Sequence, residues 1–158
     1  MVTTTEGILN VEDRAWLAAT LDSEASIVYA RRKAKGRNGK ELNQPHYRGT
    51  VTVYTRDQRL VDELIKRTGI ERVYRSGEKG KAWRMVSGDI KRLGPQIVDL
   101  MFRKQDQLRL MLEALELAEK NTPIAGQPFE ADEEALNRRN EIAREISKLN
   151  HRTPKAGQ

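Results

Sequence analysis

The chain has 158 residues, of which 37% are hydrophobic and 33% charged, so we expect one domain with a highly charged surface. It contains no cysteine, which excludes disulfide bonds and zinc sites built on thiolates. The apolar runs are too short for a transmembrane helix, and the N-terminus lacks the basic and apolar segments of a secretory signal. We therefore expect a soluble intracellular protein, in a bacterial or phage cytoplasm or in an organelle.

The net charge is +6, and it is unevenly distributed along the chain. Residues 26–59 hold nine Lys and Arg against two acids, and residues 66–84 hold seven against two. Residues 1–25 and 105–150 are both net acidic. Such segregation indicates a polyanion-binding surface that is supported by an ordinary scaffold.

The first two expected elements are a helix and a strand. Residues 10–25, NVEDRAWLAATLDSEA, predict a helix with Asn10 as its N-cap. Residues 26–33, SIVYARRK, alternate as a strand does, with Ile27 and Tyr29 on one face. A loop rich in Gly, Asn and Lys follows, and residues 47–55, YRGTVTVYT, are the clearest strand of the sequence.

The next segments predict a second helix and a second pair of strands. Residues 56–69 form an amphipathic pattern that Gly69 ends. Residues 72–86 predict a hairpin with its turn around Gly77–Gly80. Residues 89–104 are expected to be helical, with a break near Gly94–Pro95, and residues 107–120 form a strong helix.

The element order is therefore α-β-β-α-β-β-α with appended helices. Both strand pairs have connections too short for parallel crossovers, so we predict an α+β fold with a four-stranded antiparallel sheet and helices on one face. The expected domain organisation is a core over residues 8–120, a linker and C-terminal helix over 121–150 that packs on the core, and a basic disordered tail over 151–158.

The other face of the sheet should be polar and basic. Its strands combine phosphate-binding side chains with side chains that can read base edges in the major groove of DNA. A solvated charged face is the alternative, and RNA is a competing ligand, although the paired stacking aromatics of common single-strand RNA readers are missing. The side chains expected on this face include Arg32, Arg48, Thr50, Thr52, Tyr54 and Arg84.

The sequence gives little support for a histidine-based catalytic site or a phosphate-binding loop. His46 and His151 are isolated, which argues against a histidine-based metal site or a Ser–His–Asp triad. GEKGK at residues 77–81 lacks the spacing of a phosphate-binding loop, so a hairpin turn is the better interpretation.

Glu24 is placed where local electrostatics oppose it, because a helix C-terminus carries partial negative charge. The position becomes favourable if a divalent cation binds there, since Mg²⁺ prefers oxygen ligands and the terminal carbonyls of a helix are unsatisfied acceptors. The residues alone leave an ordinary exposed glutamate as the alternative.

The segment LAATLDSEA at residues 17–25 resembles the motif of the LAGLIDADG homing endonucleases, with Leu17, Ala18, Leu21, Asp22 and Glu24 at matching positions. The resemblance extends over about residues 8–150. It includes the element order, the segments VTVYT, VDELIKRTG and FRKQDQLRLML, and the single motif of the homodimeric members. The chain departs from the family at Ala19 and Ala25, where the family often has glycine.

The resemblance implies a set of site residues. Glu24 would bind the catalytic Mg²⁺, for which Mn²⁺ could substitute, with the Ser23 carbonyl as a neighbouring ligand. Lys104 matches a basic residue near the scissile phosphate. Arg59, or alternatively Gln58 or Arg56, would order solvent after the second strand. The implied DNA-binding residues are Val28, Ala30, Arg32, Lys33, Lys35, Arg37, His46, Arg48, Thr50, Thr52, Tyr54, Arg72, Tyr74, Ser76, Lys79, Lys81 and Arg84.

A single motif implies a homodimer in which two such helices pack together, with Ala15, Ala18, Ala19 and Asp22 at the interface. The resemblance thus implies metal-dependent double-strand cleavage of a long pseudo-palindromic DNA site by an intron-homing enzyme. Two alternatives remain: a non-cleaving DNA-binding protein or intron RNA maturase of the same fold, and a protein-interaction role for the acidic helices of residues 105–150.

Overall fold

The computed structural model describes residues 7–32, 46–120 and 132–152. It confirms the predicted α+β architecture and element order. The elements are α1 (Val11–Glu24), β1 (Ala25–Arg32), β2 (His46–Thr55), α2 (Gln58–Thr68), β3 (Val73–Ser76), β4 (Gly80–Met85), α3 (Ser87–Ile97), the 3₁₀ turn η2 (Val98–Leu100), α4 (Gln105–Lys120) and α5 (Glu133–Arg152).

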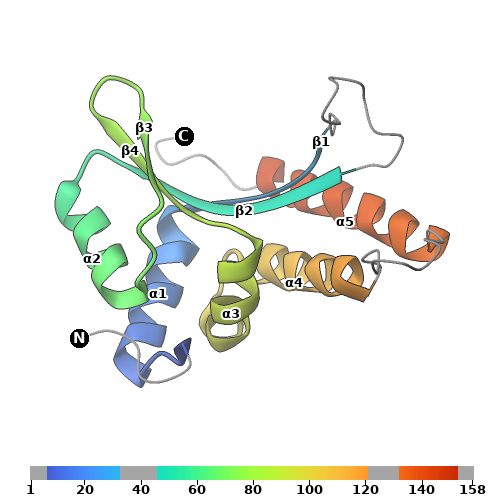
Figure 1. The fold of residues 1–158 in the computed structure, drawn as a ribbon, viewed down its shortest axis with the longest axis horizontal. Helices are drawn as coiled ribbons and strands as arrows, with labels where there is room; N and C mark the ends of the chain where they lie inside the picture. The colour runs from blue at the N-terminus through green and yellow to red at the C-terminus, as the bar shows by residue number, and fades with distance from the viewer. Residues whose placement is uncertain (1–6, 33–45, 121–131, 153–158) are drawn as a thin grey trace, which may run out of the picture.

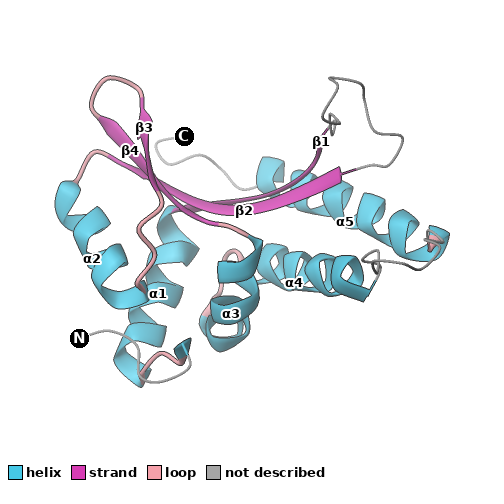
Figure 2. Ribbon diagram, in the orientation of Figure 1, coloured by secondary structure: helices cyan, strands magenta, loops and turns pink. Residues whose placement is uncertain are grey.

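The four strands form one antiparallel sheet in the order β1-β2-β4-β3. Helices α1 to α4 lie below the strands in the view of Figure 1, α5 packs against β1 and α4, and no described helix covers the opposite side of the sheet. Figure 2 shows the same division between the helical layer and the curved sheet. The uncovered side is called the outer face below.

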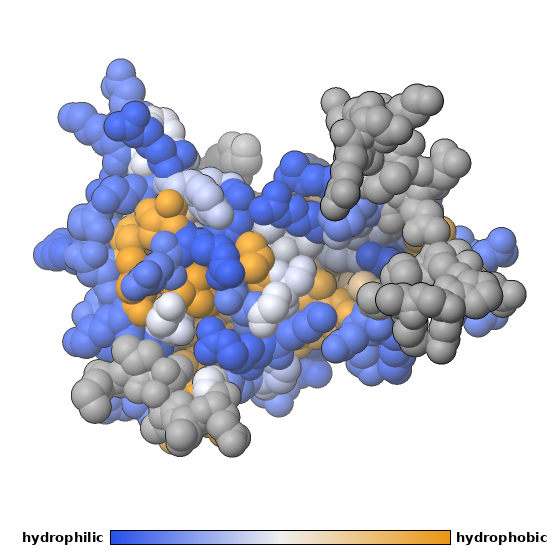
Figure 3. Space-filling view, viewed as in Figure 1, coloured by the Kyte–Doolittle hydropathy of each residue, from blue (hydrophilic) through white to orange (hydrophobic). Residues whose placement is uncertain are grey.

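The strand pattern explains which side is buried. Ile27, Val51, Val53, Trp83 and Met85 alternate toward the helices, and each is at most 1% exposed. The residues between them point to the outer face, as the period of two along a strand requires. Hydrophilic side chains predominate over the β3–β4 hairpin in Figure 3.

The predicted ends of α1 and α2 are confirmed by their capping geometry. The Asn10 side chain accepts a hydrogen bond from the Asp13 backbone amide at 2.8 Å. Gly69 takes the left-handed conformation, with φ of 74°, and its amide bonds to the Ile65 carbonyl. A residue with a Cβ would adopt this conformation at a cost, so Gly69 ends α2 for a physical reason.

The predicted break at Gly94–Pro95 is wrong, because α3 continues through both residues to Ile97. Pro95 removes only one helical hydrogen bond near the end of α3, and the Val98 amide still bonds to the Gly94 carbonyl. Gly94 instead permits close packing, since a Cβ there would lie 2.8 Å from a methyl carbon of Leu112 on α4.

Helix α5 packs against the inner side of β1. Its Ile142 and Ile146 are at most 1% exposed, and Asn150 donates a hydrogen bond to the Ile27 carbonyl at 2.7 Å. The helix includes His151 and Arg152, which were predicted to belong to a disordered tail. The tail from residue 153 onward and the predicted linker lie outside the described residues.

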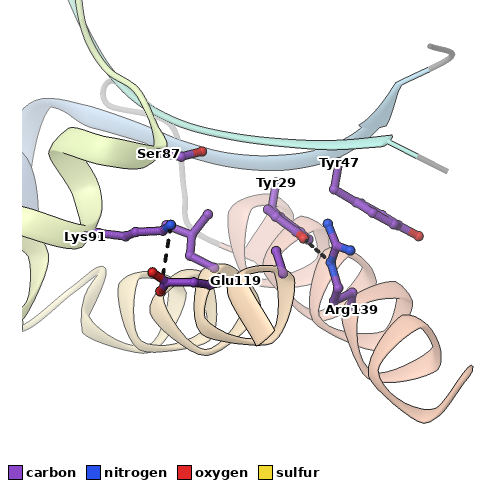
Figure 4. Close-up of a pocket in the computed structure, with 8 residues that line it drawn as sticks. Tyr29, Tyr47, Ser87, Lys91, Glu119 and Arg139 are labelled. Carbon is purple, nitrogen blue, oxygen red and sulfur yellow. Dashed lines mark hydrogen bonds and ion pairs between the residues drawn. The ribbon is translucent and has the colours of Figure 1, made fainter. Parts of the chain in front are cut away.

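A hollow of about 500 Å³ lies between the inner side of the sheet and helices α3, α4 and α5 (Figure 4). At one wall, Tyr29 and Tyr47 stack with ring centroids 5.2 Å apart. Arg139 of α5 lies over Tyr47 and donates a hydrogen bond to the Tyr29 hydroxyl at 2.9 Å. These contacts hold α5 to the two strands on the side away from the outer face.

Within the described residues, no helix has both the length and the apolar character needed to cross a membrane.

Candidate nucleic-acid interface and helix-end site

The outer face is built from side chains that the strand register sets in rows. Ser26 of β1 pairs with Thr52 of β2, which pairs with Arg84 of β4. Further along β1 and β2, Ala30 pairs with Arg48. Two further rows on the outer face pair Val28 with Thr50 and Arg32 with His46.

Most of the predicted DNA-binding residues of β1 and β2 are accessible on this face. Arg32, His46 and Arg48 are exposed, and Val28 is 41% exposed. Ser26 is also exposed on this face. It was missed, although its spacing of two residues from Val28 gave a signal for it.

Thr52 differs from its neighbours because it is only 3% exposed. Arg84 lies over it, and the Arg84 Nε donates a hydrogen bond to the Thr52 hydroxyl at 3.2 Å. The expected contact of Thr52 with DNA would therefore require Arg84 to move.

Two tyrosines flank a small residue at the β2–β4–β3 end of the outer face. Tyr54 and Tyr74 both pair with Ala82, so the three side chains form one row across three strands. The tyrosines are 54% and 46% exposed, whereas Ala82 is 3% exposed. The Arg84 guanidinium lies 5.1 Å from the centroid of the Tyr74 ring. This end of the face therefore combines exposed aromatic rings with the Arg84 guanidinium, which other side chains hold in place.

Two of the predicted DNA-binding cations have partners within the chain. Lys81 occupies the inward position in β4, two residues before Trp83, and its ammonium donates to the Gln58 side-chain oxygen. Arg72 forms an ion pair with Asp89 at 2.6 Å. Contacts within the protein therefore fix the positions of both side chains.

The remaining predicted residues of this set divide into two groups. Ser76 ends β3, and Lys79 is exposed in the turn that follows it. The predicted residues Lys33, Lys35 and Arg37 lie outside the described residues.

Glu24 is the last residue of α1, and the chain enters β1 at Ala25, which pairs with Val53. The Glu24 side chain is exposed and forms no hydrogen bond or ion pair with another described residue. Its carboxylate is therefore available to an external cation beside the sheet.

Lys104 approaches the same helix end from the turn before α4. Its ammonium donates to the Ala25 carbonyl, the first residue of β1. Burial lowers the pKa of Lys104, and the neighbouring Arg103 charge lowers it further, while Asp22 and Glu24 act in the opposite direction. The structure thus places Lys104 and Glu24 at the same end of α1, close enough to interact electrostatically.

The Asp22 carboxylate, unlike that of Glu24, is hydrogen-bonded within the chain. Its Oδ1 accepts hydrogen bonds from the backbone amides of Phe102 at 3.1 Å and Lys104 at 2.8 Å. Burial alone would raise the pKa of Asp22, but hydrogen bonds from the backbone of residues 102–104 and the Lys104 charge lower it below its usual value. Asp22 therefore fixes the turn that carries Lys104.

The residues expected to order solvent make other contacts. The Gln58 side-chain oxygen accepts a hydrogen bond from the Lys81 ammonium, and its amide nitrogen donates one to the Asp62 carboxylate at 2.8 Å. Arg59 pairs with Asp57 at 3.3 Å and its side chain is 92% exposed. No hydrogen bond or ion pair joins Gln58 or Arg59 to Glu24 or Lys104 in the described part of the chain.

The described residues contain no group of three or more His, Cys, Asp or Glu side chains that could hold a metal ion. One chain offers the free Glu24 carboxylate and backbone oxygens at the end of α1, with Ser23 next to it. This donor set suits an oxygen-preferring cation such as Mg²⁺, but a complete coordination sphere would need phosphate, water or a second carboxylate.

An apolar strip is exposed along α1. Val11 is 80% exposed, and Ala15 and Ala19 follow at intervals of four residues on the same side of the helix. Phe102, beside the end of α1, is 90% exposed and was not predicted as a site residue. The expected interface role of Ala18 is wrong for this surface, because Ala18 is 1% exposed and packs in the core of its own chain.

No family model and no curated protein match the sequence. Solved structures of homing endonucleases do match the fold. I-CvuI bound to the I-CreI target superposes with a TM-score of 0.72 at 16% identity, covering 94% of this chain and 88% of that chain. The archaeal intron-encoded I-Vdi141I, complexed with DNA, gives 0.70 at 12% identity, covering 93% and 89%.

I-SmaMI bound to uncleaved DNA with calcium gives a TM-score of 0.64 at 20% identity, and the match covers 89% of this chain but 46% of that one. The chain therefore spans most of I-CvuI and I-Vdi141I and about half of I-SmaMI. I-SmaMI is itself described as a LAGLIDADG homing endonuclease. The chain thus has the fold of the LAGLIDADG homing endonucleases, which the resemblance of residues 17–25 predicted.

Proposed function

We propose that the chain is a LAGLIDADG homing endonuclease that acts as a homodimer and makes Mg²⁺-dependent double-strand breaks in a long pseudo-palindromic DNA site. The observation that carries the proposal is the free, exposed Glu24 carboxylate at the end of α1, with the Lys104 ammonium bound at the adjoining Ala25 carbonyl. The Glu24 side chain is exposed and takes no part in the packing of the core.

The outer face supports duplex DNA as the substrate. It carries accessible arginines and hydroxyl groups on an antiparallel sheet, and a β-surface of this kind can enter the major groove. The acidic residues of α4 and α5 lie on the opposite side of the sheet. I-CvuI and I-Vdi141I, which share the fold, were both solved in complexes with DNA.

The residues divide the chemistry between them. Glu24 would hold the cation at the helix end, and its symmetry mate in a second copy would supply another carboxylate. Lys104 would place positive charge near the phosphate, and Asp22 would keep the Lys104 turn in position. Bound Mg²⁺ would supply an activated water and stabilisation of the leaving oxygen.

Two variants on one helix test this assignment. Glu24→Gln keeps the size of the side chain and removes its charge, so cleavage should fall by at least about 100-fold while DNA binding persists. Glu12→Gln removes an exposed charge at the other end of α1 and serves as the matched control. The substrate is a supercoiled plasmid library of candidate sites with Mg²⁺, and linear product is measured on gels.

Full cleavage by Glu24→Gln would overturn the assignment. Absence of a double-strand break with the unmodified chain, together with tight binding of duplex DNA, would instead favour a non-cleaving DNA-binding protein. Absence of cleavage with tight binding of structured intron RNA would favour a maturase.

A further inference from the structure

The outer face holds one arginine in a way that distinguishes it from its neighbours. Arg84 lies on β4, an interior strand of the sheet, between Thr52 on β2 and Tyr74 on β3. Its Nε donates to the Thr52 hydroxyl at 3.2 Å, and its guanidinium lies 5.1 Å from the centroid of the Tyr74 ring. The side chain is therefore fixed from two sides.

These contacts leave the recognition edge of the guanidinium available. The hydrogen bond to Thr52 uses Nε, whereas the two terminal nitrogens make no hydrogen bond or ion pair with a described residue. A planar fork with free N–H groups on both terminal nitrogens matches the O6 and N7 acceptors that guanine presents in the major groove.

Two other arginines that were predicted to bind DNA have different environments. Arg48 is exposed and forms no hydrogen bond or ion pair with a described residue. Arg72 is paired with Asp89 at 2.6 Å. Phosphate contacts tolerate a mobile side chain, whereas bidentate base recognition requires a defined orientation, and holding the side chain in advance reduces the entropy lost on binding.

We propose that Arg84 reads a guanine in each half of the DNA site, and that Thr52 and Tyr74 act as positioning residues for it. The inference deepens the proposed function, on which it rests, by assigning one base of the substrate. In this arrangement the burial of Thr52 has a role, because its hydroxyl acts through Arg84 and not by touching DNA.

The test selects duplexes from a randomised DNA library with the full-length Glu24→Gln chain, so that binding is measured without cleavage. Arg84→Ala and Arg84→Lys should abolish the preference for guanine at one position of each half-site and leave the other positions unchanged. Affinity for the selected site should fall about 10- to 100-fold, and the charge-retaining lysine should not restore the preference.

Arg48→Ala is the matched control. Because its side chain is not held by protein contacts, we expect it to add charge without reading a base, so its loss should weaken all sequences about equally and reduce the salt dependence of binding, with no change of the base profile. Replacing the selected guanine by 7-deazaguanine, which lacks N7, should weaken binding by the parent chain and have little further effect on Arg84→Ala.

Thr52→Val and Tyr74→Leu test positioning. Each should reduce the guanine preference partially, without the uniform loss of affinity expected for Arg48→Ala. Thermal unfolding of both variants establishes that the fold is retained, and an unchanged base profile in a folded Thr52→Val chain would overturn the positioning role.

The outcomes separate this inference from the proposed function. A selected profile that Arg84→Ala leaves unchanged overturns the inference alone. If the parent chain enriches no duplex sequence at all, the inference and the proposed function both fail.

Discussion

Asp22 and Glu24 show how two neighbouring carboxylates acquire opposite roles. Asp22 accepts hydrogen bonds from the backbone amides of Phe102 and Lys104, whereas Glu24 makes none with the described residues. The partial negative charge of a helix C-terminus disfavours both acids. Asp22 offsets this cost through its amide donors, whereas Glu24 has the nearby Lys104 charge and would be stabilised further by an external cation.

The first prediction concerns Asp22→Asn. The change removes the charge that the backbone amides stabilise, so the free energy of unfolding at neutral pH should fall by about 1–3 kcal/mol. Chemical denaturation of the variant and the parent chain measures the difference. Glu24→Gln is the control, since the absence of partners for Glu24 predicts little change in stability.

The pH dependence of this difference follows from the lowered pKa of Asp22. A depressed carboxyl pKa gives stability that is present above the ordinary value of 3.8 and is lost as pH falls through the folded-state pKa. The parent chain should therefore lose its advantage over Asp22→Asn in acid below that value. A difference that stays constant from neutral pH into this acid range would contradict the assigned role.

The sequence predicted part of the site from single residues. Glu24 and Lys104 could be singled out as candidates because a recognisable motif and segment carried them, and the structure places them at the same helix end. Lys81 could have been assigned to the inner side, because it stands two residues before the buried Trp83 in one strand. The burial of Thr52 could not be predicted, because it depends on which rotamer Arg84 adopts across the sheet.

At the level of elements, glycines mark where helices and strands approach closely. Gly94 lies against Leu112 of α4, which explains a glycine within α3 better than a helix break does. Alternation and capping residues predicted the strands and helix ends, because those signals are local. The contact between α3 and α4 joins residues that are distant in sequence. The local pattern therefore favoured a helix break, which is the usual interpretation of a Gly-Pro pair.

The second prediction tests such an approach at Gly49 in β2. A Cβ there would lie 2.5 Å from the Met111 sulfur of α4, so Gly49→Ala should destabilise the chain by about 1–3 kcal/mol through overpacking. Gly88→Ala is the control, because a Cβ at Gly88 meets no atom within 4 Å and alanine suits α3. That change should be neutral or stabilise by up to about 1 kcal/mol.

A double variant identifies the atom responsible for the Gly49 effect. Gly49→Ala combined with Met111→Ala should lose less free energy of unfolding than the sum of the single changes, because the second change removes the crowded sulfur. Strict additivity in denaturant titrations would place the strain elsewhere.

For the whole molecule, the arrangement separates three surfaces. The basic outer face lies on one side of the sheet, the helices lie on the other, and the apolar strip runs along α1, the helix that ends at Glu24. Helix α5 contributes fully buried isoleucines to the core, which makes truncation before it an unsuitable test of the dimer. Substitution on the exposed strip of α1 leaves the core intact and therefore tests the proposed second copy more directly.

The third prediction is that Ala19→Arg disrupts the proposed homodimer. Ala19 is exposed on α1, so a monomer can accommodate the arginine, whereas a helix-to-helix interface would bury an unpaired charge. Such burial costs about 3–5 kcal/mol, which raises the dimer dissociation constant by more than about 100-fold. Sedimentation equilibrium measures the constant, and Ser147→Arg on the exposed side of α5 is the control. A dimer that Ala19→Arg leaves intact, or an unmodified chain that stays monomeric on DNA, would contradict this interface and the shared arrangement of two Glu24 carboxylates.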